Sequence, residues 1–280
     1  SAASDVYKRQ ASTYQEHRAC IQMIERVTLD KVILIADRGY ENYNIMSHAI
    51  EKGWKFLIRI KDVHSNGIAS GLELPQTAVF DMDINLILTR NQTKSKKQAG
   101  YKFMPTVQTF DYLPIGSKED YPISFRIARF KIADDSYETV ITNLDRFCFS
   151  AEKLKELYHL RWGIETSFRE LKYAIGLTSF HAKKVDYIKQ EIFARLTLYN
   201  YCELITTYVV EHTENISKKN QVNFTIAIYI CREYLRRKRK LRPPDVVKLI
   251  EKHILPIRPG RRDPRKVKPQ ASVSFLYRVA

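Results

Sequence analysis

The sequence predicts an α/β fold in which the α/β core is interrupted by a β-rich insertion and followed by a helical carboxyl-terminal part. Three observations predict it. Residues 32–35 form a continuous apolar run, as in a strand that is buried on both faces. Residues 62–148 hold short runs of β-branched and aromatic residues between clusters of Gly, Pro, Asn and Asp. From Ser150, which can cap a helix with Glu152 in its first turn, the pattern becomes helical.

The first part of the chain predicts the order helix, strand, helix, strand. A helix is expected over 14–27 and strands near 31–36 and 54–60. Asp37 follows the first strand directly, and Gly39 allows the chain to turn there. Open α/β sheets bind ligands at the carboxyl ends of their strands, so Asp37 is a candidate functional residue. The alternative is an aspartate that begins a turn or caps the next helix.

The β-rich insertion is expected to contain hairpins or a small antiparallel sheet. Its strand-like runs lie near 79–89, 101–110, 121–132 and 137–142. Beyond it, helices are expected near 186–212, which is strongly apolar and should bury against the sheet, and near 222–237. Pro243 and Pro244 open a further short helix, and an extended tail rich in Pro and Arg follows Pro256.

Charge points to a polyanionic partner. The 280 residues carry a net charge of +16, and the stretch from Arg232 to Lys268 has 15 Lys and Arg against four Asp and Glu. Such a stretch binds polyanions with salt-dependent affinity, although a solvated tail is the alternative, and charge alone fits RNA or an anionic membrane equally. A run of 18 apolar residues and a signal peptide are both missing, so we expect no membrane association and a cytoplasmic location. The four cysteines form no C-x2-C pair, which argues against zinc.

The segment YHLRWGIETSFRELK, residues 158–172, places Tyr158, Arg161, Glu165 and Lys172 at Y-x2-R-x3-E-x6-K spacing. At about 100° per residue of a continuous helix, the four side chains fall within an arc of roughly 60°. A second, apolar stripe runs beside them, so the polar stripe is expected along the rim of a buried face. The apolar stripe consists of Leu157, Ile164, Phe168, Leu171 and Ile175. The alternative is a surface helix with ordinary ion pairs at close spacing.

The strand-end Asp37 and this spacing together resemble the DDE transposases of the insertion-sequence-four family, from about residue 14 to the carboxyl terminus. The resemblance implies a ribonuclease-H-like core that cleaves DNA at transposon ends and transfers the strand into target DNA. It implies that Asp37 and Glu165 are catalytic carboxylates that hold Mg²⁺ or Mn²⁺. It also implies that Tyr158, Arg161 and Lys172 contact transposon-end DNA, that a homodimer forms in the synaptic complex, and that the protein works at a prokaryotic nucleoid.

The resemblance leaves the first catalytic carboxylate unassigned. The family carries it on a strand before the helix at 14–27, where this chain offers only Asp5. Residues 1–10, SAASDVYKRQ, resemble a translated sequencing adapter, so we expect this segment to be non-native and the chain to be truncated. The strands near 31–36 and 54–60 would then be the fourth and fifth of the core, the first of them with an unpaired edge. We expect such a fragment to aggregate and to be catalytically inactive.

The resulting division of the chain has five parts. Residues 11–61 are a partial ribonuclease-H-like core, 62–148 the β-rich insertion, 149–212 the rest of the core with the signature segment, and 213–280 a basic helical region and tail, after the segment 1–10. Two other functions remain open: another nuclease or resolvase of the same core fold, and a basic nucleic-acid-binding protein without catalysis. The four-residue spacing and the β-rich insertion argue against the first.

Overall fold

The computed structural model describes residues 13–63, 65–93, 96, 100–134, 136–213, 220–237, 242–257 and 274–275. The chain divides into two compact units, with the boundary between Trp162 and Gly163. We call residues 9–162 the amino-terminal unit and residues 163–280 the carboxyl-terminal unit, and describe each by itself. The five-part division predicted from the sequence stays a prediction, and its segment 1–10 lies outside the described residues.

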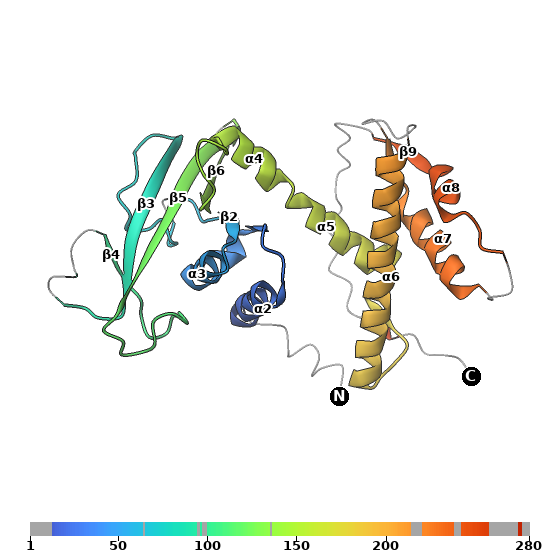
Figure 1. The fold of residues 1–280 in the computed structure, drawn as a ribbon, viewed down its shortest axis with the longest axis horizontal. Helices are drawn as coiled ribbons and strands as arrows, with labels where there is room; N and C mark the ends of the chain where they lie inside the picture. The colour runs from blue at the N-terminus through green and yellow to red at the C-terminus, as the bar shows by residue number, and fades with distance from the viewer. Residues whose placement is uncertain are drawn as a thin grey trace. The chain divides into compact units, whose positions relative to one another are not determined.

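A six-stranded mixed sheet forms the amino-terminal unit, in the order β1-β2-β6-β5-β3-β4 (Figure 1). The strands are β1 (Ile33–Ala36), β2 (Lys55–Arg59), β3 (Phe80–Thr89), β4 (Tyr101–Phe103), β5 (Asp120–Ala133) and β6 (Ser136–Thr142). β1 and β2 are parallel, with Leu34 opposite Phe56. Both strands lie where the sequence predicted them, and β1 is an edge strand of the sheet that the described residues form.

Helices cover the part of the sheet that carries β1 and β2 because its strands are apolar on both faces. On one face, Phe56 and Ile58 belong to the main core with the helices α2 (Thr13–Arg26) and α3 (Tyr43–Glu51), which pack against each other (Figure 1). On the other face, Leu57 belongs to a second core with α4 (Ala151–His159). The three buried residues in the middle of β2 are therefore apolar on both faces, between Lys55 and Arg59 at its ends.

The insertion strands lie close to the predicted places, and β5 pairs antiparallel with both β3 and β6, as expected for hairpins. They also extend the sheet of β1 and β2, because β6 pairs antiparallel with β2. At this junction, Thr142 Oγ1 donates a 2.5 Å hydrogen bond to the carbonyl of Phe56, and the Phe56 N–H donates a 2.8 Å bond to Asn143 Oδ1. β4 ends at Phe103, short of the predicted 110, and it runs parallel to β3.

Arg126 ties the insertion strands to the start of α4. This buried side chain of β5 forms a bidentate ion pair with the carboxylate of Asp81 on β3. Its Nη1 atom donates a 2.8 Å hydrogen bond to the carbonyl of Phe149. Phe149 immediately precedes Ser150, whose side chain caps α4 as predicted. The position of α4 therefore depends on a charge buried in the sheet.

The carboxyl-terminal unit is helical. Its helices are α5 (Trp162–Arg169), which begins one residue before the unit boundary, α6 (Val185–His212), α7 (Phe224–Arg236) and α8 (Val246–Glu251), with a π-helix, η3 (Glu170–Ala174), after α5. Cys202 and Val209 of α6 pack with Ala227 and Cys231 of α7. The buried residues of α6 thus pack with α7 and α8 (Figure 1). The sheet belongs to the other unit, so the prediction that α6 buries against it stays a prediction.

Two pairs of short strands complete this unit. β8 (Asn220–Val222) pairs antiparallel with β9 (Ile254–Pro256), and β7 (Ser179–Phe180) pairs parallel with β10 (Ser274–Phe275). Most of the predicted extended tail after Pro256 lies outside the described residues. In the parts of the chain that the structure describes, none of the helices has the length and apolar character needed to cross a membrane.

Candidate active site

Asp37 occupies the position predicted for it, one residue beyond the end of β1. Its Oδ1 atom accepts a 2.8 Å hydrogen bond from the backbone N–H of Gly39 and so caps the 3₁₀-helix η1 (Arg38–Tyr40). The capping role that was the alternative for Asp37 is therefore present. The residue is nevertheless exposed, and a carboxylate has two oxygens. Capping and a functional role are compatible.

Tyr158, the first residue of the signature, packs on the same sheet as β1. Only 2% of its surface is exposed, and it lies in the core cluster with Leu57, Val140 and Leu154. Ile35, two residues before Asp37, packs against this cluster. The sheet and α4 thus hold the signature tyrosine beneath the end of β1.

The electrostatics of Tyr158 agree with that placement. Burial raises the pKa of its phenol. The charges of Arg161 and Arg59 lower this pKa, and those of Glu138 and Asp37 raise it. The packing of Ile35 against this cluster brings the end of β1 close to Tyr158, although Asp37 and Tyr158 are 121 positions apart in the sequence (158 minus 37). The buried phenol oxygen has no hydrogen-bond partner among the described residues.

Arg161 stacks on the aromatic residues beside it. Its guanidinium carbon lies 4.8 Å from the ring centroid of Trp162 and 5.8 Å from that of Tyr158. Tyr158 and Trp162 also line an open hollow of about 830 Å³, together with Arg59 and Glu138, which form a 3.0 Å ion pair. The structure thus brings Asp37, Tyr158 and Arg161 to one region of the amino-terminal unit.

The continuous signature helix was predicted wrongly. α4 ends at His159, and Leu160 and Arg161 form a turn in which their N–H groups bond to the carbonyls of Leu157 and Tyr158. Both hydrogen bonds join residues three positions apart, as in a 3₁₀-helix, and such bonds are common at the end of an α-helix. After α5, the chain widens into the π-helix η3, where Ile175 N–H bonds to the carbonyl of Glu170. A single 100° step therefore does not relate Tyr158 to Lys172.

Glu165 and Lys172 belong to the carboxyl-terminal unit. Glu165 is exposed in the first turn of α5, and Lys172 is half-buried in η3. The predicted apolar stripe does not bury here, since Ile164 is 50% and Phe168 is 56% exposed. Because Asp37 and Glu165 lie in different units, their shared site stays a prediction. Across the described ranges, no three His, Cys, Asp or Glu side chains gather as a metal site would require.

A nearby carboxylate in the same segment has a different character. Burial and the charge of Glu203 raise the pKa of Glu170. Glu203 in turn accepts a 2.6 Å hydrogen bond from the hydroxyl of Tyr199 on α6. Glu170 is thus engaged in packing η3 on α6, which leaves Glu165 as the exposed carboxylate of the signature.

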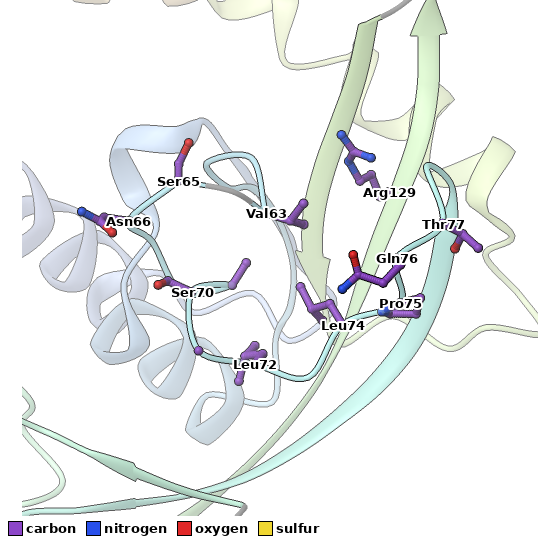
Figure 2. A pocket seen from close by; sticks show the side chains of 12 residues that line it. Val63, Ser65, Asn66, Ser70, Leu72, Leu74, Pro75, Gln76, Thr77 and Arg129 are labelled. Atoms are coloured by element: carbon purple, nitrogen blue, oxygen red, sulfur yellow. The ribbon is translucent and has the colours of Figure 1, made fainter.

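A small hollow of about 220 Å³ lies between the loop 63–77 and β5. Figure 2 shows Arg129 at one side of it, with Leu74 and Gln76 of the loop across from it. The guanidinium of Arg129 pairs with Asp62 at 3.3 Å, donates to the carbonyl of Ala78 at 2.9 Å and stacks on Tyr137. Arg129 therefore holds the loop on the sheet.

The family model described as the transposase DDE domain matches residues 5–201, more than half of the chain. The chain belongs to this family. Family membership accounts for the mixed sheet with helices and, in general terms, for the use of divalent metal ions by such enzymes.

Curated relatives are transposases of insertion sequences. The "Probable transposase for insertion sequence element IS5377" of Geobacillus stearothermophilus is 23% identical over 178 residues, which is 62% of this chain and 40% of that protein. The "Transposase for insertion sequence element IS421" of Escherichia coli is 39% identical over 57 residues, 20% of this chain and 15% of that protein. The chain thus spans less than half the length of these relatives.

Proposed function

We propose that this DDE-domain chain is part of a DNA transposase of the insertion-sequence-four type, built on a ribonuclease-H-like core. It would cleave DNA at transposon ends and transfer the freed strand into target DNA. The observation that carries the proposal is the placement of Asp37 at the end of β1, whose Ile35 packs against the core cluster that contains the buried signature Tyr158. DNA cleavage by this mechanism needs a carboxylate such as Asp37 at a strand end, with side chains such as Tyr158 and Arg161 nearby to contact the DNA.

Asp37 and Glu165 would hold Mg²⁺ or Mn²⁺, and both are suited to this because each is an exposed carboxylate with hard oxygen donors. Divalent ions in such sites stabilise the attacking and leaving oxygens of phosphoryl transfer. Gly39 orients the carboxylate of Asp37 through its N–H. Burial fixes Tyr158, so its ring can position Arg161 for contact with a DNA phosphate.

Lys172 would supply a point charge to the same DNA strand. Transposon-end and target DNA are the proposed partners, with a homodimer in the synaptic complex and a location at the prokaryotic nucleoid. The chain by itself is proposed to bind DNA and metal without completing cleavage, because no residue in it is assigned as the first carboxylate.

Iron-directed backbone cleavage tests the metal site without requiring transposition. Fe²⁺ replaces Mg²⁺ at carboxylate sites and, with ascorbate and peroxide, cuts the polypeptide nearby. We expect cuts near Asp37 and Glu165 that excess Mg²⁺ or Mn²⁺ suppresses and that Asp37→Ala removes. Asp83→Ala, a change at an exposed carboxylate of the same unit, should leave the cuts in place.

Cuts scattered over the chain, or unaffected by Asp37→Ala, would exclude a metal site at Asp37. DNA binding that survives that result would then favour the non-catalytic nucleic-acid-binding function, for which the net charge of +16 is the supporting observation.

A further inference from the structure

A cationic pocket opens beside Asp37 in the amino-terminal unit. It has a volume of about 470 Å³ and draws its walls from α2, η1, β4 and the chain after β2. Its basic side chains are His17, Arg38, Lys61 and Lys102, which come from four separate parts of the sequence. Sequence reasoning missed the pocket, because only the fold brings these residues together.

Two of these basic side chains have no ion-pair partner among the residues that the structure describes. Arg38 and Lys102 form no ion pair with any carboxylate in the ranges that the structure describes, whereas Lys61 donates a 2.9 Å hydrogen bond from Nζ to the carbonyl of Asn66. Arg38 also follows Asp37 directly, as the first residue of η1. An unpaired guanidinium and an unpaired ammonium in one hollow attract an anion.

The carboxylate in the pocket is already occupied. Glu41 accepts a 2.8 Å hydrogen bond from the backbone N–H of Lys61 through Oε2, and its Oε1 accepts one from the N–H of Ile68. Gly67 makes this possible, since a Cβ there would overlap Glu41 Oε1 and lie 3.2 Å from the Cβ of Lys61. Glu41 thus fixes the loop that forms one wall and leaves Arg38 and Lys102 to a ligand.

Tyr43 supplies a second, independent sign of a missing ligand. It lines the same pocket, is only 2% exposed, and its buried hydroxyl has no hydrogen-bond partner in the described part of the chain. Burial and the charge of Glu41 raise the pKa of this phenol, so it stays a hydrogen-bond donor at neutral pH. A buried donor without an acceptor costs free energy unless something supplies one.

We propose that this pocket binds a phosphate group of a DNA strand and so anchors the strand beside Asp37, with Arg38 and Lys102 as its cationic ligands. The inference rests on the proposed function for its choice of DNA, and it adds a phosphate subsite that none of the signature residues lines. Lys102 brings this subsite to the β-rich insertion, which otherwise has no assigned role in DNA binding.

The test measures binding of the full chain to a fluorescein-labelled duplex by anisotropy over a series of salt concentrations. Lys102→Gln is compared with Lys118→Gln, which removes the same charge from an exposed loop of the same unit. We expect Lys102→Gln to weaken binding and to reduce the salt slope by about 1, as loss of one phosphate contact does. Lys118→Gln should leave the slope unchanged.

Arg38→Gln provides a second variant at another residue that lines the pocket, with circular dichroism to show that each protein is folded. Equal slopes for the folded Lys102 and Lys118 variants, with no effect of Arg38→Gln, would overturn the proposal.

Inorganic phosphate distinguishes a DNA phosphate from a free anion. At equal ionic strength, phosphate should compete with DNA better than chloride, and this excess should vanish in Lys102→Gln. If phosphate binds to the pocket but Lys102→Gln does not change the affinity for DNA, the pocket is a site for free phosphate. That result would overturn the DNA assignment. The two proposals can also be told apart. If iron does not cut the chain near Asp37 but Lys102→Gln still weakens DNA binding, the metal site is contradicted and the phosphate pocket is supported.

Discussion

The carboxylate of Asp37 is oriented by the chain that follows it, because its Oδ1 atom accepts a 2.8 Å hydrogen bond from the N–H of Gly39. A Cβ on residue 39 would lie 3.1 Å from that same oxygen. The neighbouring carboxylate would have to shift by a few tenths of an ångström, since such a distance is shorter than an ordinary van der Waals contact.

Gly39→Ala should therefore weaken Mn²⁺ binding with little change in stability. The hydrogen-bond partners of a ligating carboxylate typically change metal affinity by roughly 10- to 100-fold, and we expect the lower end of that range. Titration calorimetry with Mn²⁺ measures the effect. Gly163→Ala is the control, because its Cβ would meet nothing within 4 Å. Equal Mn²⁺ affinity in the wild type and Gly39→Ala would contradict the assigned role of Asp37.

The buried ion pair between Arg126 and Asp81 should be the most sensitive point of the sheet. Asp81→Ala leaves the guanidinium of Arg126, of which only 3% of the side chain is exposed, without its main counter-charge. Removal of one partner of a buried pair costs about 3–5 kcal/mol of unfolding free energy. Urea unfolding measures this change in free energy. We expect α4 to be destabilised as well, because Arg126 also donates a hydrogen bond to the carbonyl of Phe149.

The matched control is Asp83→Ala. Asp83 lies two residues further along β3 and pairs with Arg146 at 3.1 Å, but its side chain is 68% exposed. Surface pairs contribute about 0–1 kcal/mol, so this change should be nearly neutral. A similar cost for the two variants would show that Arg126 is not held by Asp81.

Asp111 should make the unfolding free energy depend on pH. Burial alone would raise the pKa of its carboxyl group, but the 2.8 Å hydrogen bonds that Asn44 and His48 donate, together with the His48 charge, lower this pKa below the ordinary value of 3.8. The stabilisation is therefore fully present above the unfolded-state pKa, and it is lost as the pH falls through the lower folded-state pKa.

Asp111→Asn should remove this component. The difference in unfolding free energy between the wild type and the variant should be constant from pH 6 to 5 and shrink toward pH 3, measured by urea unfolding at each pH. A difference that grows as the pH falls would reverse the sign and contradict the lowered pKa.

Local patterns in the sequence located the elements well, and non-local pairing accounts for what they missed. The apolar run before Asp37 and the β-branched runs of the insertion became strands because both signals depend on residues close in sequence. That β6 would join β2 could not be read in advance, since it depends on Thr142 and Asn143 meeting Phe56 across the chain.

The signature segment shows the same limit in a helix. Its spacing predicted one regular helix, yet the turn at Leu160 and Arg161 contains no Pro or other breaker that could have signalled it. The pocket of Arg38 and Lys102 was equally out of reach, because the two residues are 64 positions apart (102 minus 38) and neither lies in a recognisable motif.

The edge of β1 should make the isolated chain prone to aggregation. Val32 directs its carbonyl toward β2, where it accepts a 2.9 Å hydrogen bond from Lys55, so alternation along the strand turns the backbone of Ile33 toward the open edge. Charged residues on edge strands oppose pairing with other chains. Ile33→Lys should slow the growth of light scattering at high protein concentration. Ile132→Lys should not, although Ile132 is 42% exposed and Ile33 36%.

Glu165→Gln should separate a catalytic from a structural carboxylate. Glu165 is exposed in the first turn of α5, so its loss should change the unfolding free energy by no more than about 0.5 kcal/mol, as for most surface substitutions. Removal of a negative charge from a DNA-facing site should leave duplex binding unchanged or tighten it when metal is absent, while Mn²⁺ binding weakens. Fluorescence anisotropy with EDTA, urea unfolding and Mn²⁺ titration measure the three effects, with the exposed Glu211→Gln as the matched control. A loss of several kcal/mol of stability with unchanged Mn²⁺ affinity would instead make Glu165 a structural residue, because the two functions predict opposite patterns across the same three measurements.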